Sequence, residues 1–448
     1  MRILHISTRL ILGGSQENTV LSCEGQARLG HEVHLAFGPI YGPEGSLLER
    51  VEWFNAEARA GGKHLPITTH VLPHMVREVH PVKDHICFHH ELRPLIQKVK
   101  PDVVHTHSSK AGILGRWAAW KELVPTPPRP SPGGGGRPAI VHTIHGPPFM
   151  PVEGDALQRL KIRVMNSAYT LAERFAAKRC HTIVSVADAM TREFLARGIG
   201  RPEQYVTVRS GMEVGPFLQA SGPDDTREAV RARLGFGPED FVIGTVARLA
   251  QHKGHDDILD ALADEMQVRP HWRLLWVGDG WWRGRLEAKA RGVGLGVREA
   301  GRDEETERRR DGVGTEGQVA HAQVVLTGLV PPGHIPEMIR AMDVLVHPSY
   351  REGLPRTVPQ ALLCGVCPVA YDVDGTGEAC REMETGRLVR VGDVAGLREA
   401  IRWCAEHPEA RAALAARGRE ECRVAFSAEE MVRRLEGVYA HAIRRVGR

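Results

Sequence analysis

The chain has 448 residues, 42% of them hydrophobic and 25% charged, and its 59 basic and 55 acidic residues give a formal net charge of +4. This length favours two or three domains, each with a core of its own. The balanced charge gives no indication of nucleic-acid binding, so we expect no nucleic-acid partner. No apolar run approaches the roughly 20 residues of a membrane-spanning helix. The amino terminus lacks an apolar signal region, so we expect a cytoplasmic protein.

In the first half of the chain, short apolar runs alternate with helical patterns up to about Arg209. This alternation predicts a doubly wound parallel sheet in an α/β domain. A glycine pair, Gly13-Gly14, lies between the first strand and a predicted helix at 18–29, where it allows the backbone to approach a phosphate or an acceptor oxygen. The predicted strands are 3–7, 33–37, 103–107, 140–144, 182–186 and 205–208.

A second alternating series predicts a second doubly wound sheet, so we expect two Rossmann-like domains with a cleft between them. Its strands are predicted at 242–246, 273–277, 324–327, 344–347, 368–370 and 388–391. The last segment begins with Ser427 as an N-cap and continues with apolar residues at helical spacing, which predicts a helix. The expected domains are therefore 1–209 and 210–426, followed by a terminal helix at 427–448.

Two insertions have compositions that cannot bury a core, and we expect solvated loops there. One, at 125–138, is rich in proline and glycine, and the other, at roughly 297–323, is charged and contains Arg308-Arg309-Arg310. The eight cysteines are scattered, which fits reduced thiols better than a disulfide framework. Cys364 and Cys367 have the spacing of a redox pair but not its context.

Two segments that each follow a predicted strand carry the chemistry of the second domain. Arg248 and Lys253 follow one strand and supply two cations for a diphosphate. Glu352, Gly353 and Leu354 follow another, and we expect Gly353 and Leu354 to open a helix whose free N–H groups favour an anion. Because the carboxyl ends of parallel strands meet at one edge of a sheet, these residues predict a site that binds a pyrophosphate and stabilises it as it leaves.

Two histidine-containing segments end strands of the first domain: His105-Thr106-His107 and His142-Thr143-Ile144-His145. We expect the imidazoles of each segment to point to opposite faces of the strand, so that neither segment offers a metal-binding face. Asp372 and Asp374 imitate a metal-binding D-x-D motif, but cations already supply the countercharge for a diphosphate. No metal and no cofactor is therefore expected.

Taken together, these motifs resemble the retaining glycosyltransferases of family 4, which have the two-domain GT-B fold. The resemblance covers nearly the whole chain, from the Gly13-Gly14 loop to Phe426-Ser427 before the last helix. The order and spacing of the motifs are more specific than any one of them. The resemblance implies a nucleotide-sugar donor bound as a co-substrate, a cleft between the domains, and a last helix that crosses back to the first domain.

The resemblance also assigns roles to single residues. Glu352 is expected to bind hydroxyls of the donor sugar, and His145, in preference to His107, to contact the same sugar. Arg248 and Lys253 are expected to take up the negative charge of the leaving nucleotide. Main-chain groups complete the donor site: Gly13 and Gly14 in the first loop, Gly278 and Gly280 near the phosphates, Val330 near the nucleobase, Gly353 and Leu354 beside Glu352, and residues 375–378 along the sugar.

The chain departs from the family pattern at Gln360, where the family has a second glutamate seven residues after the first. A carboxylate there accepts hydrogen bonds from ribose hydroxyls, whereas an amide has only one accepting oxygen and no charge. The difference is worth roughly 1 to 2 kcal/mol, or about tenfold in donor affinity. Since enzymes lower barriers by on the order of 8 kcal/mol or more, Gln360 is expected to weaken or retune donor binding without abolishing activity.

The sequence leaves three functions open. The first is a hexosyltransferase that moves a sugar, most simply from a UDP-linked donor, to a glycan or polyprenyl-linked acceptor. The second is a non-hydrolysing nucleotide-sugar epimerase, and the third is a catalytically silent nucleotide-sugar binder, which Gln360 suggests. A basic, apolar helical pattern at 155–179 also allows peripheral contact with an anionic membrane at the inner face of the plasma membrane.

Overall fold

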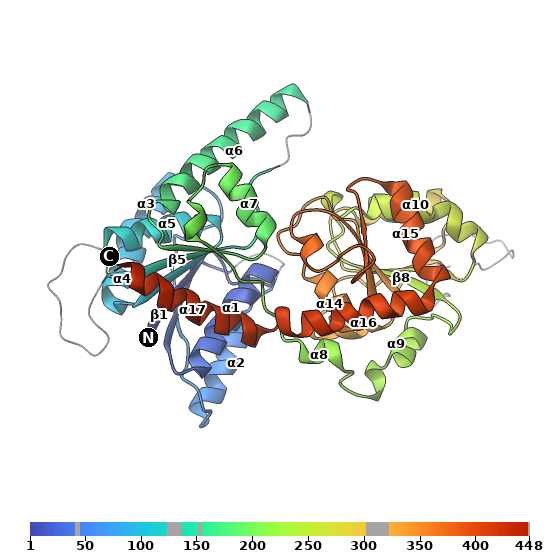
Figure 1. The fold of residues 1–448 in the computed structure, drawn as a ribbon, viewed down its shortest axis with the longest axis horizontal. Helices are drawn as coiled ribbons and strands as arrows, with labels where there is room; N and C mark the ends of the chain where they lie inside the picture. Colours follow the sequence, from blue (N-terminus) through green and yellow to red (C-terminus); the bar gives the residue numbers. More distant parts are fainter. Residues whose placement is uncertain (41–44, 123–136, 151–154, 302–321, 447–448) are drawn as a thin grey trace. The chain divides into compact units, whose positions relative to one another are not determined.

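The computed structural model describes residues 1–40, 45–122, 137–150, 155–301 and 322–446. The chain forms two compact units (Figure 1), of which unit 1 comprises Met1–Met212 with Ala425–Arg448 and unit 2 comprises Glu213–Val424. Both unit boundaries lie within a few residues of those expected from the sequence. Most of the 125–138 insertion and the Arg308-Arg309-Arg310 run lie outside the described residues.

Unit 1 contains a seven-stranded parallel sheet in the order β3-β2-β1-β4-β5-β6-β7. Its strands are β1 (Arg2–Ser7), β2 (Glu32–Phe37), β3 (Thr68–Val71), β4 (Val103–His107), β5 (Ala139–Ile144), β6 (Thr182–Ser185) and β7 (Tyr205–Thr207). Six of them were predicted from the sequence. β3 was missed because three of its four residues are exposed at the sheet edge, so it lacks the apolar pattern of a buried strand.

The helices of unit 1 are α1 (Gly14–Arg28), α2 (Leu48–Arg59), α3 (Pro81–Ile86), α4 (Arg93–Val99), α5 (Ser109–Lys121), α6 (Ala156–Ala177), α7 (Asp188–Ala196) and α17 (Ala428–Val446), with a π-helical segment at Cys87–Leu92. α1 begins four residues before the predicted helix. Figure 1 shows α17, in red, beside α1. At this contact a Cβ on Gly25 of α1 would lie 2.4 Å from a methyl carbon of Val432.

α17 completes the core of unit 1, as the family resemblance implies. Its Met431, Leu435 and Tyr439 are buried with Ile3 and Val103 of the sheet. The helix begins where the sequence places it, because the Ser427 hydroxyl accepts a hydrogen bond from the N–H of Glu430 at 3.1 Å.

Unit 2 contains a second seven-stranded parallel sheet, in the order β10-β11-β9-β8-β12-β13-β14. Its strands are β8 (Phe241–Val246), β9 (Trp272–Val277), β10 (Val297–Glu299), β11 (Val324–Leu326), β12 (Val344–His347), β13 (Cys367–Tyr371) and β14 (Arg387–Val389). The sequence predicts a loop from about residue 297 onward, but this prediction is wrong for its first residues, because Val297–Glu299 form β10. β10 pairs in parallel with β11 at the sheet edge, so pairing in the folded sheet outweighs its weak local pattern.

The helices of unit 2 are α8 (Gly215–Leu218), α9 (Arg227–Arg233), α10 (His255–Val268), α11 (Arg283–Gly292), α13 (Ile335–Arg340), α14 (Thr357–Leu363), α15 (Val394–Glu406) and α16 (Pro408–Ala425). Apolar residues of β8, β9, β12 and β13 form one core with α10, α11 and α15. A rigid parallel sheet therefore presents the carboxyl ends of its central strands, where the predicted site residues lie.

Candidate active site

The predicted diphosphate-binding residues gather at the point in unit 2 where the strand order reverses. β8 and β12 are neighbours, and the chain continues from β8 to β9 on one side and from β12 to β13 on the other. The loops after β8 and β12 therefore diverge, which is where open parallel sheets bind ligands. Arg248 and Lys253 lie in the first of these loops, and Glu352 lies in the second.

Glu352 is held by two side chains. Its Oε1 lies 2.5 Å from the Nζ of Lys253 and 3.0 Å from the Nε2 of His347, the last residue of β12. The side chains of Lys253 and Glu352 are 20% and 13% exposed, so the pair is mostly shielded from water. Lys253 has two further N–H donors available by its chemistry.

The surroundings of Glu352 keep it ionised. Burial by itself raises the pKa of this carboxyl group, but the hydrogen bond from His347 and the charges of His347 and Lys253 lower the pKa well below its ordinary value. A fixed negative charge thus lies next to a lysine at the carboxyl end of β12.

Arg248 is exposed, and its guanidinium carbon lies 5.8 Å from the centre of the Trp281 ring. The pKa of the His252 imidazole depends on the charges around it. Burial lowers the pKa of His252 most, the positive charges of Lys253, Arg351 and Arg248 lower it further, and Glu352 opposes them. Arg248 and Lys253, the two cations predicted to bind a diphosphate, therefore both lie close enough to His252 to lower its pKa.

The expectation that Gly353 and Leu354 open a helix is wrong, since α14 begins at Thr357. Pro355 disfavours the helical conformation at the residue before it. The segment is also tied to the 374–375 loop, because the Glu352 N–H donates to the Asp374 carboxylate at 2.6 Å and the N–H of Gly375 donates to the carbonyl of Gly353 at 3.0 Å. The N–H groups of Gly353 and Leu354 thus belong to a loop.

Two predicted phosphate-loop glycines are required by packing between loops. A Cβ on Gly278 would lie 2.1 Å from the carbonyl oxygen of Ala247, and one on Gly280 would lie 2.3 Å from that of Leu249. Gly278 also has a φ of +140°, a conformation that favours glycine. The loop after β9 therefore fits closely against the loop that carries Arg248.

The other residues of unit 2 that the sequence analysis considered lie on different elements. Val330 follows β11 and is half-buried, and Gln360 is half-buried on α14. Asp372 is exposed, whereas Asp374 has a φ of +48° and binds the main chain of Glu352. The two aspartates of the D-x-D sequence therefore occupy different surroundings.

In unit 1, the corresponding reversal of strand order lies between β1 and β4. Gly13 is the N-cap of α1 and Gly14 is its first residue, so this pair forms the turn after β1. His145 follows β5 and is half-buried, with its Nε2 3.1 Å from the Nδ1 of His107.

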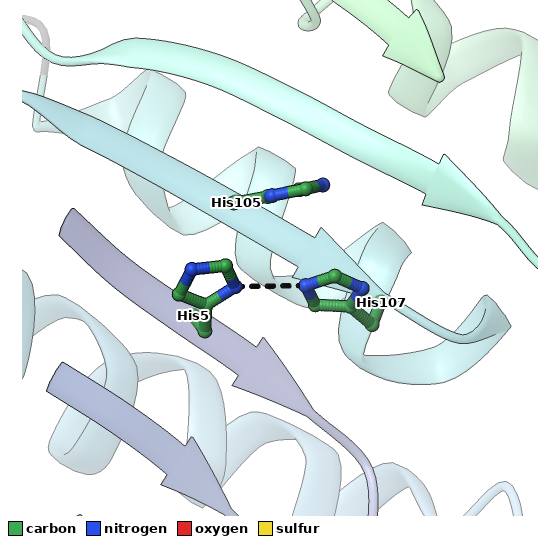
Figure 2. A group of neighbouring side chains, drawn as sticks. All are labelled: His5, His105 and His107. Atoms are coloured by element: carbon green, nitrogen blue, oxygen red, sulfur yellow. Dashed lines mark hydrogen bonds between the residues drawn. The ribbon is translucent and has the colours of Figure 1, made fainter. Parts of the chain in front are cut away.

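The expectation that His105 and His107 point to opposite faces is wrong, because residues two apart in a strand share a face. Both are buried beside His5 of β1 (Figure 2), and potential ligand atoms of the three side chains lie within 4.8 Å of one another. The register pairs His5 directly with His105 across β1 and β4. A correct use of strand periodicity predicts the shared face, but their proximity to His5 requires the sheet order.

Sequence reasoning also missed His347 and Asp374, which hold Glu352 in place. A polar residue that ends the apolar strand Val344–His347 was the available signal for His347. The role of Asp374 depends on the fold, because it joins loops 22 residues apart. The eight cysteines are free thiols, and burial raises the pKa of Cys364 to about 12, so this thiol is protonated and unreactive at neutral pH.

Two family models match the chain, one described as a glycosyl transferase 4-like domain over residues 13–211 and one described as glycosyl transferases group 1 over residues 240–407. The chain is 28% identical over 259 residues to 2-deoxystreptamine glucosyltransferase of Streptomyces kanamyceticus, covering 58% of this chain and 60% of that protein. It is 26% identical over 306 residues to UDP-Gal:alpha-D-GlcNAc-diphosphoundecaprenol alpha-1,3-galactosyltransferase of Escherichia coli, covering 68% and 66%. Each alignment thus spans less than two thirds of the relative's length.

Among solved structures, Anabaena HepE in complex with UDP aligns over 98% of this chain and 100% of its own, with a TM-score of 0.70 at 19% identity. Two doubly wound sheets with this alignment define the GT-B class of fold. With both family models matched in order along the sequence, the chain belongs to the group 1 glycosyltransferases of family 4.

Proposed function

We propose that this chain transfers a sugar from a UDP-linked donor to a hydroxyl of a glycan or lipid-linked acceptor, with retention of configuration and without a metal ion. The observation that carries this proposal is the shielded Lys253–Glu352 pair at the strand-order reversal of unit 2. Its position inside the segment matched by the group 1 model supports the assignment. A UDP-galactose donor in the name of a relative and UDP in a similar structure support the choice of nucleotide.

In this proposal Arg248 and Lys253 bind the donor diphosphate. As the bond between sugar and phosphate breaks, negative charge grows on the leaving nucleotide, and fixed cations stabilise it without reorganising. The loop N–H groups of Gly353 and Leu354 contribute to the same stabilisation. Glu352, ionised and fixed, accepts hydrogen bonds from hydroxyls of the donor sugar, with His145 as a further sugar contact.

Retention follows when the acceptor hydroxyl attacks on the face that the nucleotide leaves. The departing phosphate then serves as the base that takes the acceptor proton, so the proposal needs no additional protein base. Positive charge that develops on the sugar ring is stabilised by the adjacent phosphate and by the carboxylate of Glu352.

The proposed acceptor is bound by unit 1 and is glycan or polyprenyl-linked. Relatives support a lipid-linked acceptor, since one is named for an undecaprenol-linked acceptor and another for a diacylglycerol product. Of the helices that the structure describes, none combines the length and the apolar character needed to cross a membrane. We propose instead that α6 makes peripheral contact with anionic lipid at the inner face of the plasma membrane.

The test begins with a thermal-shift screen of purified protein against a panel of nucleotide sugars, since a bound donor raises the melting temperature. Transfer from the selected donor to extracted lipid and glycan acceptors is then measured. Lys253→Ala is expected to lower kcat/KM by about 100-fold or more, because it removes a group aimed at the leaving charge. The matched control is Lys289→Ala on α11, because Lys289 is also paired with carboxylates, those of Asp256 and Asp260 on α10.

Three outcomes contradict the proposal. If Lys253→Ala leaves the rate of sugar transfer unchanged, Lys253 does not stabilise the leaving nucleotide. Release of a sugar inverted at C2 without any acceptor identifies an epimerase. Calorimetric donor binding without transfer to any extracted acceptor identifies a silent nucleotide-sugar binder.

A further inference from the structure

A cavity of about 330 Å³ lies in unit 2 at the amino ends of β12 and β13. Its lining comes from the start of α9, the segment between α13 and β12, the turn between α14 and β13, and the first turns of α16. Glu352 follows the opposite, carboxyl end of β12. The cavity and the candidate active site therefore lie at opposite edges of one sheet, and every residue that lines the cavity belongs to unit 2.

The charged side chains that line this cavity are mostly positive. Three of them are arginines, Arg227, Arg340 and Arg411, and one is an aspartate, Asp343. Arg340 also forms an ion pair with Asp225, which is not part of the lining, at 3.3 Å. The other charges at the cavity therefore depend on Asp343 for compensation.

Asp343 is shared by three guanidinium groups. Its Oδ1 lies 2.7 Å from a terminal nitrogen of Arg227 and 3.5 Å from one of Arg411, and its Oδ2 lies 3.1 Å from one of Arg231. Because Arg227 and Arg411 approach the same oxygen, their guanidinium groups lie close to each other. One carboxylate compensates for one positive charge, so these four side chains keep two positive charges in excess.

This excess charge is partly shielded from water. The side chains of Arg231, Asp343 and Arg411 are 7%, 13% and 17% exposed, whereas that of Arg227 is 36% exposed. Burial lowers the pKa of Arg227, and the charges of Arg231 and Arg411 lower it further against the opposing effect of Asp343. Shielded charges in proteins are normally paired, so a bound anion would compensate for the excess.

Two of the arginines have N–H donors left for such an anion. A guanidinium group has five N–H donors. Within the described part of the chain, Arg227 donates three hydrogen bonds and Arg411 donates one. Arg340 and Arg231 donate four each to described residues, mostly to main-chain carbonyls that hold the loops around the cavity. Arg227 and Arg411 are therefore the pair suited to bind a ligand.

We propose that this cavity binds a phosphate dianion between the guanidinium groups of Arg227 and Arg411, either as free phosphate or as the phosphate monoester of a small molecule. Planar guanidinium groups bind phosphate oxygens through paired hydrogen bonds. A phosphoryl group carries nearly two negative charges at neutral pH, which matches the excess, whereas a carboxylate carries one. The volume of the cavity is also within the range of small-molecule sites, about 300 to 1,000 Å³.

A purely structural role is the competing explanation for these arginines. Side chains that hold carbonyl groups and Asp343 in place need no ligand. In that case Arg411→Gln lowers the melting temperature, but phosphate stabilises neither the wild-type protein nor the variant. The phosphate-dependent shift in melting temperature, and not the melting temperature alone, therefore distinguishes the two explanations.

The test is a thermal-shift titration of the full-length protein at constant ionic strength, with inorganic phosphate, glycerol phosphate and acetate as separate ligands. Both phosphates are expected to raise the melting temperature in a saturable manner, and acetate is not. The phosphate ligand that saturates at the lower concentration identifies the source as free phosphate or a monoester. If neither phosphate stabilises the protein more than acetate, the proposal is overturned.

Substitutions of Arg411 test the residue assignment. Arg411→Gln is expected to raise the phosphate concentration at half-saturation about tenfold or more, because it removes a charged donor. Arg411→Lys keeps the charge but not the planar fork, so an intermediate affinity is expected.

The matched control is Arg398→Gln on α15. Arg398 is half-buried like Arg411, and each donates to a main-chain carbonyl at 2.8 Å, that of Ala261 for Arg398 and that of Cys404 for Arg411. Arg398 does not line the cavity, so its substitution should leave phosphate binding unchanged. An equal loss of phosphate binding in Arg398→Gln and Arg411→Gln overturns the assignment.

Lys253→Ala separates this cavity from the candidate active site, which is also proposed to bind phosphate groups. Phosphate binding at the cavity should persist in this variant and in the presence of UDP. If phosphate stabilisation is lost in Lys253→Ala and kept in Arg411→Gln, the phosphate is bound at the candidate active site and the proposal is overturned. No residue of the cavity takes part in the proposed sugar transfer, so a failure of either proposal leaves the other intact.

Discussion

The carboxylate of Glu352 depends on Lys253 for its charge compensation. Removing one partner of a buried ion pair costs about 3 to 5 kcal/mol. Since these side chains retain 13% and 20% exposure, we expect Lys253→Met to lower the free energy of unfolding of unit 2 by about 2 kcal/mol at neutral pH. Urea denaturation measures the change.

The cost of Lys253→Met should depend on pH with a defined sign. The pKa of Glu352 is lowered in the folded protein, and an unfolded glutamate has a pKa of about 4.3. The ionised group therefore stabilises the fold above about pH 4.3 and loses this contribution as the pH falls further. The difference between wild type and Lys253→Met is expected to shrink on acidification, whereas Lys253→Met/Glu352→Gln should show a constant difference. A constant difference in the single variant contradicts this assignment.

Substitutions of Gln360 test whether this side chain contributes to donor affinity. Gln360→Glu restores the carboxylate of the family pattern and supplies a second, charged acceptor for ribose hydroxyls. We expect donor affinity to rise about tenfold, measured by calorimetry with UDP, while Gln360→Ala falls below the wild type. Equal affinity of all three proteins would show that this side chain does not meet the nucleotide.

Among the elements, α6 has an unusual exposed face. Leu157, Leu160, Val164 and Leu171 follow one another at helical spacing and are 58% to 77% exposed. No acidic residue occurs between Ala156 and Ala172, whereas Arg159, Lys161 and Arg163 flank the apolar stripe. The N-terminal half of the helix extends away from the sheet of unit 1 (Figure 1). Apolar burial and attraction to anionic headgroups both favour a lipid surface.

Leu160→Glu should weaken flotation with vesicles that contain anionic lipid by about tenfold or more, because burial of one leucine contributes about 1.5 to 3 kcal/mol. The control is Leu29→Glu, since Leu29 of the same unit is 57% exposed and Leu160 is 58% exposed. Binding that does not respond to anionic lipid, or an equal effect of both substitutions, would contradict membrane contact through α6.

Edge elements show where sequence patterns stop being informative. Buried strands such as β4 and β12 have apolar runs whose ends were predicted correctly, because a strand covered on both faces needs them. β3 and β10 lie at sheet edges, and only the neighbouring strand defines them. The start of α14 depends on Pro355 and on hydrogen bonds to the 374–375 loop, which local helix signals do not contain.

At the scale of the whole molecule, the stability of unit 1 depends on α17, with which the chain returns from unit 2 to unit 1. α17 buries Met431, Val432, Leu435, Val438, Tyr439 and Ala442. At about 1.5 to 3 kcal/mol for each large side chain, this burial contributes roughly 10 kcal/mol, comparable with the total stability of a domain, about 5 to 15 kcal/mol. A chain that ends at Phe426 is therefore expected to lose the calorimetric transition of unit 1 and keep that of unit 2. Two unchanged transitions would show that α17 is dispensable.

The sequence by itself determined the two parallel sheets, the terminal helix and the placement of Arg248, Lys253 and Glu352 after strands, because apolar periodicity and strand-end loops are local properties of the chain. Tertiary structure alone decided which strands are neighbours. Strand order brings Asp374 to Glu352, and it aligns His5 with His105 and His107 across about a hundred residues of sequence. Hydrogen bonds between side chains that distant depend on sheet register, which no local pattern encodes.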